Sequence, residues 1–145
     1  MPLRQPQDFL RAGSKVFVKA PVSRMSVAGW RSIAQGKAAD AHRAANSNST
    51  RLGAAYDAVL NLSFAVLLIE GWRCTSANGH HAEALEAAAA IVGVTESVFD
   101  RVDAIRDLRN NQYQGMEPTA DDVEAALEAM ARMAPELLSY LARLR

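Results

Sequence analysis

One stretch of this sequence, from about Thr50 to Glu70, carries apolar side chains at intervals of three and four residues. This spacing is typical of an α-helix, and here the apolar face covers most of the circumference. The apolar positions are Leu52, Ala55, Tyr56, Val59, Leu60, Leu62, Phe64, Val66, Leu67 and Ile69. Such a helix must be covered on several sides, so the stretch predicts the centre of a helical bundle. We expect Gly71 to end the helix as a left-handed C-cap.

The same periodicity predicts further helices around this one. They run from about Ser26 to Ala45, from His80 to the residue before Gly93, from Thr95 to near Gly115, and from Thr119 to the end of the chain. The apolar seam of the last helix extends to Leu144, and Pro135 within it predicts a kink or a break. Half of the residues are hydrophobic but only 6% are aromatic, which favours packed helices over sheets. The sequence therefore predicts an all-α fold, an up-and-down bundle of four to five helices.

The first 24 residues differ from the rest of the chain. Three prolines interrupt regular structure there, and basic residues outnumber acidic ones by five to one. We expect residues 1–24 to form a basic, flexible arm outside the core, and residues 25–145 to form a single domain. The run from Lys15 to Lys19 could be extended, but one such piece makes no sheet. The arm is either a solvated tail or a segment that contacts RNA, a neighbouring subunit or the acidic C-terminal half.

Composition also indicates a compartment and argues against several kinds of site. Cys74 is the only cysteine, so no intramolecular disulfide can form. The first twenty residues lack the apolar core of a signal peptide, and the longest apolar run, from Phe64 to Ile69, is shorter than the ~20 residues that span a bilayer. We therefore expect a cytoplasmic protein that does not bind membranes. Net charge is zero, and motifs for a phosphate loop, a cysteine pair or a zinc helix are missing, so we expect no cofactor and no metal.

The fourth predicted helix carries the strongest candidate site. Arg106, Arg109 and Tyr113 follow Val102 at offsets of four, seven and eleven, so they lie on one face of a helix. A guanidinium group can donate two parallel hydrogen bonds to a phosphate, and a tyrosine can stack on a base. The alternative is structural: Arg106 pairs with Asp103, Arg109 extends its charge to solvent, and Tyr113 packs at the end of the helix.

Other polar residues are expected near this face. Asp57 and Asn61 are one turn apart in the central helix, and polar groups in such apolar surroundings need partners, for which Arg106 or Arg109 is suitable. His80 and His81 begin a predicted helix, where the positive end of the helix dipole favours neutral imidazole. A neutral histidine can act as a general base, whereas the alternative role is capping and packing.

Three short motifs, between about residues 50 and 115, together resemble the HEPN domain family. The residues from Arg109 to Tyr113 read Arg-Asn-Asn-Gln-Tyr, which is similar to the family's Arg-containing signature. The run from Ala55 to Asn61 is similar to its tyrosine-containing second helix. Gly71-Trp72-Arg73, followed by Gly79-His80-His81, resembles a loop and helix start found in many members. The nuclease form has His four to six residues after the Arg, but here the position five after Arg109 is Gln114, and Tyr113 is the nearest counterpart.

This resemblance implies a homodimer that binds RNA or a nucleotide, either as a metal-independent ribonuclease or as a toxin–antitoxin component. The residues implied as catalytic are Arg109, Tyr113 and His81, and those implied to bind nucleotide or phosphate are Arg106, Asn110, His80 and Asp57. Gln114 favours the alternative, a non-catalytic dimeric bundle that binds a protein partner such as a nucleotidyltransferase. A third alternative is a helical protein of unrelated function, in which the Arg and Tyr residues are structural.

Overall fold

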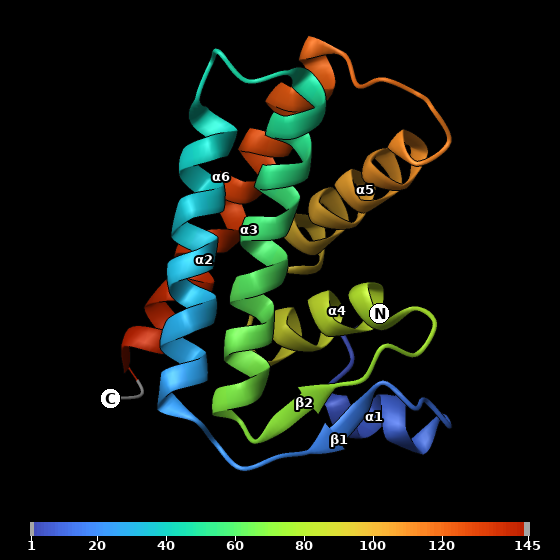
Figure 1. The fold of residues 1–145 in the computed structure, drawn as a ribbon. Helices are drawn as coiled ribbons and strands as arrows, with labels where there is room; N and C mark the ends of the chain where they lie inside the picture. The colour runs from blue at the N-terminus through green and yellow to red at the C-terminus, as the bar shows by residue number, and fades with distance from the viewer. Residues whose placement is uncertain (1, 144–145) are drawn as a thin grey trace.

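The computed structural model describes residues 2–143, and within them the chain forms six helices and two short strands (Figure 1). In chain order the elements are α1 (Pro6–Arg11), β1 (Phe17–Lys19), α2 (Arg24–His42), α3 (Asn48–Ile69), β2 (Trp72–Cys74), α4 (His80–Val92), α5 (Glu96–Gln112) and α6 (Ala120–Arg143). The all-α prediction is confirmed, and the five predicted helices correspond to α2 to α6. The additional helix, α1, lies in the segment predicted to be an arm.

The α3 helix is the centre of the bundle. It pairs antiparallel with α2, and α6 packs behind this pair (Figure 1). The α4 and α5 helices lie beside α3 on the side away from α2, and both also contact α6. The short loop before it is held by Ser47, whose hydroxyl accepts a hydrogen bond from the backbone N–H of Thr50 at 3.1 Å. More buried residues belong to α3 than to any other helix. This confirms the prediction that the helix with the broadest apolar face is the centre of the bundle.

Several predicted helix ends are confirmed by their hydrogen bonds. The hydroxyl of Thr95 accepts from the backbone N–H of Val98 at 3.4 Å at the start of α5. Thr119 and Asp122 exchange reciprocal hydrogen bonds of 2.9 and 3.1 Å before α6, which is a capping box. Gly71 follows α3 with a φ of +84°, a backbone conformation that residues with a side chain rarely adopt, as expected for a left-handed C-cap.

The last helix continues through Pro135, so of the predicted kink or break the break does not occur. Proline removes the hydrogen bond to the carbonyl of Ala131, but both residues are exposed, where water can satisfy that carbonyl. Met133 and Leu137, on either side, are fully buried and keep the helix in contact with the bundle. Leu144, predicted to extend this seam, lies outside the described residues.

The expectation that residues 1–24 lie outside the core is wrong. Phe9 and Phe17 are only 3% and 2% exposed, and Phe17 packs against Phe9 and Trp72 with ring centroids 5.6 and 6.3 Å apart. The extended piece also has a partner, because β1 pairs antiparallel with β2, with Phe17 opposite Cys74 and Lys19 opposite Trp72. These contacts join segments more than fifty residues apart, which local periodicity does not reveal.

Polar contacts fasten the same segment to α4. The backbone N–H and the guanidinium of Arg4 donate three hydrogen bonds of 2.8 to 3.0 Å to the carboxylate of Glu86. The hydroxyl of Ser14 donates to Glu83 one turn earlier. Part of the basic charge of the segment is therefore used in binding the segment to the bundle.

The central helix is long and apolar enough to cross a membrane by length and composition alone. The uninterrupted apolar run from Phe64 to Ile69 is too short to span a bilayer, but it is only part of this helix. In the bundle, 72% of its most apolar window is buried by other elements. Packing inside the bundle therefore accounts for the apolar composition of α3.

Candidate functional site

A cluster of charged side chains lies where α2, α3 and α5 meet. The Asp57 carboxylate on α3 accepts a hydrogen bond from the guanidinium of Arg109 on α5. Its other oxygen lies 3.6 Å from Nζ of Lys37 on α2. The side chains of Asp57 and Arg109 are only 21% and 20% exposed, whereas that of Lys37 is 42% exposed. One carboxylate is thus shared by two cations, so the contact leaves one positive charge uncompensated.

Arg109 stays charged despite its burial. Loss of water lowers the pKa of its guanidinium, but the hydrogen bond and the negative charge of Asp57 outweigh this effect and raise the pKa above its usual value, with a smaller contribution from Tyr113. The guanidinium carbon also lies 5.1 Å from the centre of the Tyr56 ring, a cation–π distance. Arg109 is therefore held in one place by contacts on both sides.

Tyr56 lies beneath this cluster and is 2% exposed. Its hydroxyl has no hydrogen-bond partner among residues 2–143. Burial raises the pKa of Tyr56 far above its usual value, although the charges of Arg106 and Arg109 act in the opposite direction. The phenol is therefore neutral and supplies an aromatic surface rather than a base.

Arg106 is placed one turn before Arg109 on α5. Its Nε donates to Asp103 at 3.0 Å, and an Nη lies 3.7 Å from the mostly exposed carboxylate of Asp107. The pair with Asp103 is the contact expected under the structural alternative. The Arg106 side chain also lines a hollow of about 330 Å³, which we call the histidine hollow. The hollow is lined by Arg106, Asn110, His80, His81, Ala82 and the loop residues 76–79.

The two histidines at the start of α4 have different surroundings. Nδ1 of His80 lies 3.1 Å from the carbonyl oxygen of Ala77. Because a carbonyl can only accept, Nδ1 is the donor, and Nε2 of a neutral His80 is left as an acceptor. The His81 ring packs against Tyr56 and Phe64 with centroids 6.3 and 6.5 Å away. Burial lowers the pKa of His81, and the charges of His80 and Arg109 lower it further, so His81 is neutral near pH 7.

The remaining predicted site residues are more loosely connected to the cluster. Tyr113 is 77% exposed just after the last turn of α5, so the alternative in which it packs at the helix end is wrong. It lies within electrostatic reach of Arg109. Asn110 is exposed at the edge of the histidine hollow. Asn61 is 9% exposed, but no hydrogen bond joins it to Arg106 or Arg109 in the part of the chain that the structure describes.

Sequence reasoning missed Lys37, although the chain contains a clue to its position. Residues that lie side by side in an antiparallel helical hairpin are at equal distances from one point near the loop, which here is Ser47, at the start of α3. Lys37 and Asp57 are each ten residues from Ser47, and Trp30 and Phe64 are each seventeen residues from it. The second pair is also in contact, with ring centroids 5.2 Å apart.

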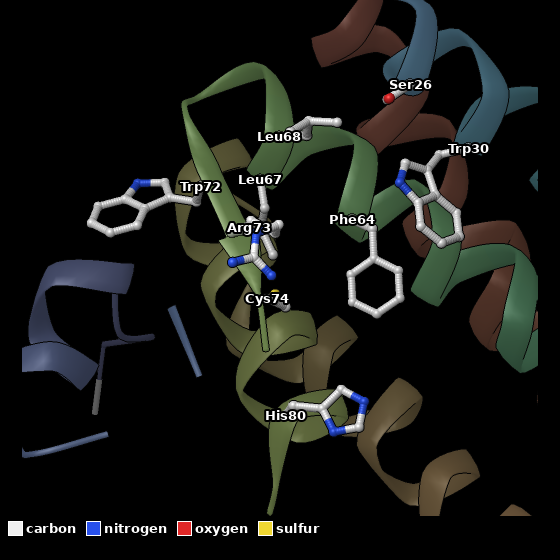
Figure 2. Close-up of a pocket in the computed structure, with 9 residues that line it drawn as sticks. All are labelled: Ser26, Trp30, Phe64, Leu67, Leu68, Trp72, Arg73, Cys74 and His80. Carbon is white, nitrogen blue, oxygen red and sulfur yellow. The ribbon is translucent and has the colours of Figure 1, made fainter. Parts of the chain in front are cut away.

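Trp30 and Phe64 belong to a second hollow, of about 450 Å³, which we call the aromatic hollow (Figure 2). It lies between α2, α3 and the segment from Trp72 to His80, and sequence reasoning did not find it. No group of three or more His, Cys, Asp or Glu side chains within residues 2–143 is arranged to hold a metal ion.

Comparison of the chain with models of protein families, with curated proteins and with solved structures gives no match in any of the three.

Proposed function

We propose that this chain is a HEPN-like protein that binds phosphate groups of RNA or of a nucleotide beside the Asp57 cluster. The observation that carries the proposal is the sharing of one carboxylate by two cations, Lys37 and Arg109. The site keeps a positive charge in a place that is partly shielded from water, where attraction for an anion is stronger than at an open surface.

The histidine hollow, whose Arg106 lies one turn from Arg109 on α5, also suits a phosphate. Arg106 is 26% exposed and offers a planar fork of donors, and its contact to Asp107, at 3.7 Å, is long enough to be exchanged for a phosphate oxygen. Asn110 adds an amide at the edge of the hollow. Asp57 fixes the direction of the Arg109 guanidinium, so little side-chain freedom remains to be lost on binding.

A metal-independent cleavage of RNA is the catalytic form of this proposal. A ribose 2′-hydroxyl attacks the adjacent phosphorus, its proton goes to a base, and the 5′-oxygen of the next nucleotide leaves with a proton from an acid. His81 is neutral near pH 7 and can accept the first proton, while Arg109 stabilises the charge that develops on the phosphate. Tyr113 would supply the second proton from its exposed position after α5.

A non-catalytic role in protein binding is the second candidate function. Tyr113 and Met116 are 77% and 59% exposed and lie three residues apart beyond α5, which gives a small apolar surface next to the charged cluster. A second copy of the chain would meet this surface in a homodimer, and a protein partner such as a nucleotidyltransferase would meet it in a complex. In either case we propose a cytoplasmic assembly.

The test is binding of a fluorescein-labelled single-stranded RNA, measured by anisotropy together with thermal unfolding of the same variants. Arg109→Ala should weaken binding about tenfold or more, because hydrogen bonds to charged groups are the strong ones. Asp57 keeps Lys37 as a partner, so the variant should still fold. The matched control is Arg101→Ala. Arg101 lies on the same helix as Arg109, and it is ion-paired with Glu128 of α6. Unchanged RNA binding with a lowered Tm would show that Arg109 is a structural residue.

A further inference from the structure

The aromatic hollow has the size and lining of a ligand site. Its volume of about 450 Å³ falls within the range of about 300–1,000 Å³ that is usual for small-molecule pockets. Figure 2 shows the rings of Phe64 and Trp30 on one side, with Leu67, Arg73 and Cys74 across from them and His80 at one end. The lining is mostly apolar, with a few polar groups at its edges.

Arg73 is an unusual member of this lining. It is exposed, and no carboxylate lies within ion-pair distance of it among residues 2–143. The facing wall holds the half-buried rings of Trp30 and Phe64. A guanidinium plane and an aromatic ring are both surfaces on which a flat, electron-rich ring stacks.

Polar groups at the edge of the aromatic hollow can form hydrogen bonds with such a ring. In its neutral form His80 has Nε2 as an acceptor, because its Nδ1 donates to the carbonyl of Ala77. The Ser26 hydroxyl accepts a hydrogen bond from Ser23 at 3.2 Å, which leaves its own hydrogen to donate. A ligand with both donors and acceptors on the rim of a flat ring would satisfy both groups. Nucleobases have this character.

The aromatic hollow is connected to the charged cluster along α3. Asp57, Phe64 and Leu68 are separated by seven and four residues, so they lie on one face of the helix. At 1.5 Å per residue, Phe64 lies about 10 Å along the helix axis from Asp57. His80 lines both the aromatic hollow and the histidine hollow, so the two hollows share a wall.

We propose that the aromatic hollow holds the base of the nucleotide whose phosphate binds beside the Asp57 cluster, with the base stacked between Phe64 and the guanidinium of Arg73. This inference rests on the proposed function, because the charged cluster must bind the phosphate. The ligand class is a nucleotide, either free or as part of a single strand. The bases of a duplex are paired and stacked on one another, so a duplex would have to open before a base could enter.

The test compares two single strands of equal length and charge, an oligoadenylate and an abasic strand with the same sugar-phosphate backbone. The wild-type chain should bind the oligoadenylate about tenfold more tightly, as expected for stacking of one base on a protein surface. Arg73→Ala should reduce this preference, because it removes one of the two groups between which the base stacks. Trp30→Phe, which changes only the wall beside Phe64, should reduce it less. Affinity for the abasic strand should stay nearly unchanged in both. Arg73 is exposed and Phe keeps an aromatic ring at position 30, so both variants should fold, which circular dichroism checks.

Two further arms separate the alternatives. Adenosine monophosphate should quench tryptophan fluorescence in the wild type but much less in Trp30→Phe, which retains Trp72. Quenching would identify a free nucleotide as a ligand. Binding of the strand without quenching by the monophosphate would identify RNA as the ligand. The control Arg43→Ala removes another exposed arginine, which pairs with Asp40. Equal affinity for the two strands, or a base preference that both variants leave intact, would overturn the base site. If Arg109→Ala still weakened binding of both strands, the proposed phosphate site would stand without it. If neither strand nor nucleotide binds, the proposed function falls, and this inference falls with it.

Discussion

Asp57 on α3 and Arg109 on α5 are 52 residues apart in the chain and are joined by a hydrogen-bonded ion pair that is mostly shielded from water. Lys37 approaches the same carboxylate from α2. Three helices are therefore connected through one side chain. Such a contact can be structural, functional or both, and the two roles respond differently to substitution.

Asp57→Asn should lower the free energy of unfolding by about 1–3 kcal/mol, since it leaves Lys37 and Arg109 facing each other without a negative charge. The loss should be smaller at high salt, because Lys37 is partly exposed and its repulsion is screened. Urea unfolding at low and high ionic strength measures both effects. A variant as stable as the wild type at low salt would show that the shared ion pair contributes nothing to the fold.

Tyr56→Phe should leave stability unchanged or raise it by about 1 kcal/mol. The Tyr56 hydroxyl is buried and has no partner in the described structure, so its removal relieves a desolvation cost. The ring, which contacts the guanidinium of Arg109, is retained. Thermal unfolding measures the difference. A loss of more than about 1 kcal/mol would reveal that the hydroxyl has a hydrogen-bond partner, such as a buried water.

His81 should make stability fall as the pH becomes acidic. Its pKa is lowered in the folded state by burial and by the nearby positive charges, so between the two pKa values the unfolded chain binds more protons than the folded one. The stability that depends on neutral His81 is fully present above the pKa of about 6.5 in the unfolded chain, and it is lost as the pH falls through the pKa in the folded state. His81→Gln should flatten this part of a stability–pH curve measured by urea unfolding, and a curve that keeps its slope in the variant would contradict this role of His81.

Phe17→Ala should destabilise the protein by about 3–5 kcal/mol, the range for truncating a buried phenylalanine. Phe17 is 2% exposed and packs between Phe9 and Trp72. Leu10→Ala is the control in the same segment, because Leu10 is 40% exposed and should cost little. If the two substitutions had equally small effects in chemical unfolding, the first 24 residues would not belong to the core.

Local periodicity was sufficient to predict the bundle. The apolar spacing of α3 and the caps at Thr95 and Thr119 depend on residues within a few turns of each other, so a single sequence reveals them. The contact of Asp57 with Arg109 was also foreseeable, because a carboxylate in an apolar helix requires a partner and the arginines of α5 were the candidates.

The remaining features depend on contacts between distant segments. The pairing of Phe17 with Cys74 joins short pieces that have no periodicity of their own, and prolines and charges around the first piece conceal its two buried aromatic residues. Lys37 and the aromatic hollow arise from the way α2 folds back on α3. Once the register of α2 against α3 is known, the position of Lys37 opposite Asp57 follows from counting, but the hollow also requires the backbone path of the segment after Gly71.

Lys37→Met provides the sharpest test of the shared carboxylate as a phosphate site. The change leaves Asp57 paired with Arg109 alone, so the contact becomes neutral while the apolar stem at position 37 is retained. Single-stranded RNA should bind more weakly, and the slope of log Kd against log salt should decrease by about 0.7, the value for one phosphate contact on a single strand.

Arg43→Met is the control for this change, since it removes one positive charge at the end of the same helix, where Arg43 pairs with Asp40. Anisotropy titrations from low to moderate salt measure both slopes. Equal slopes for Lys37→Met and the wild type would show that no phosphate replaces a counterion at this cluster. A decrease in both variants would indicate a diffuse charge effect along α2. A decrease in Lys37→Met alone would identify the place where Lys37 and Arg109 share Asp57 as the point that the phosphate contacts.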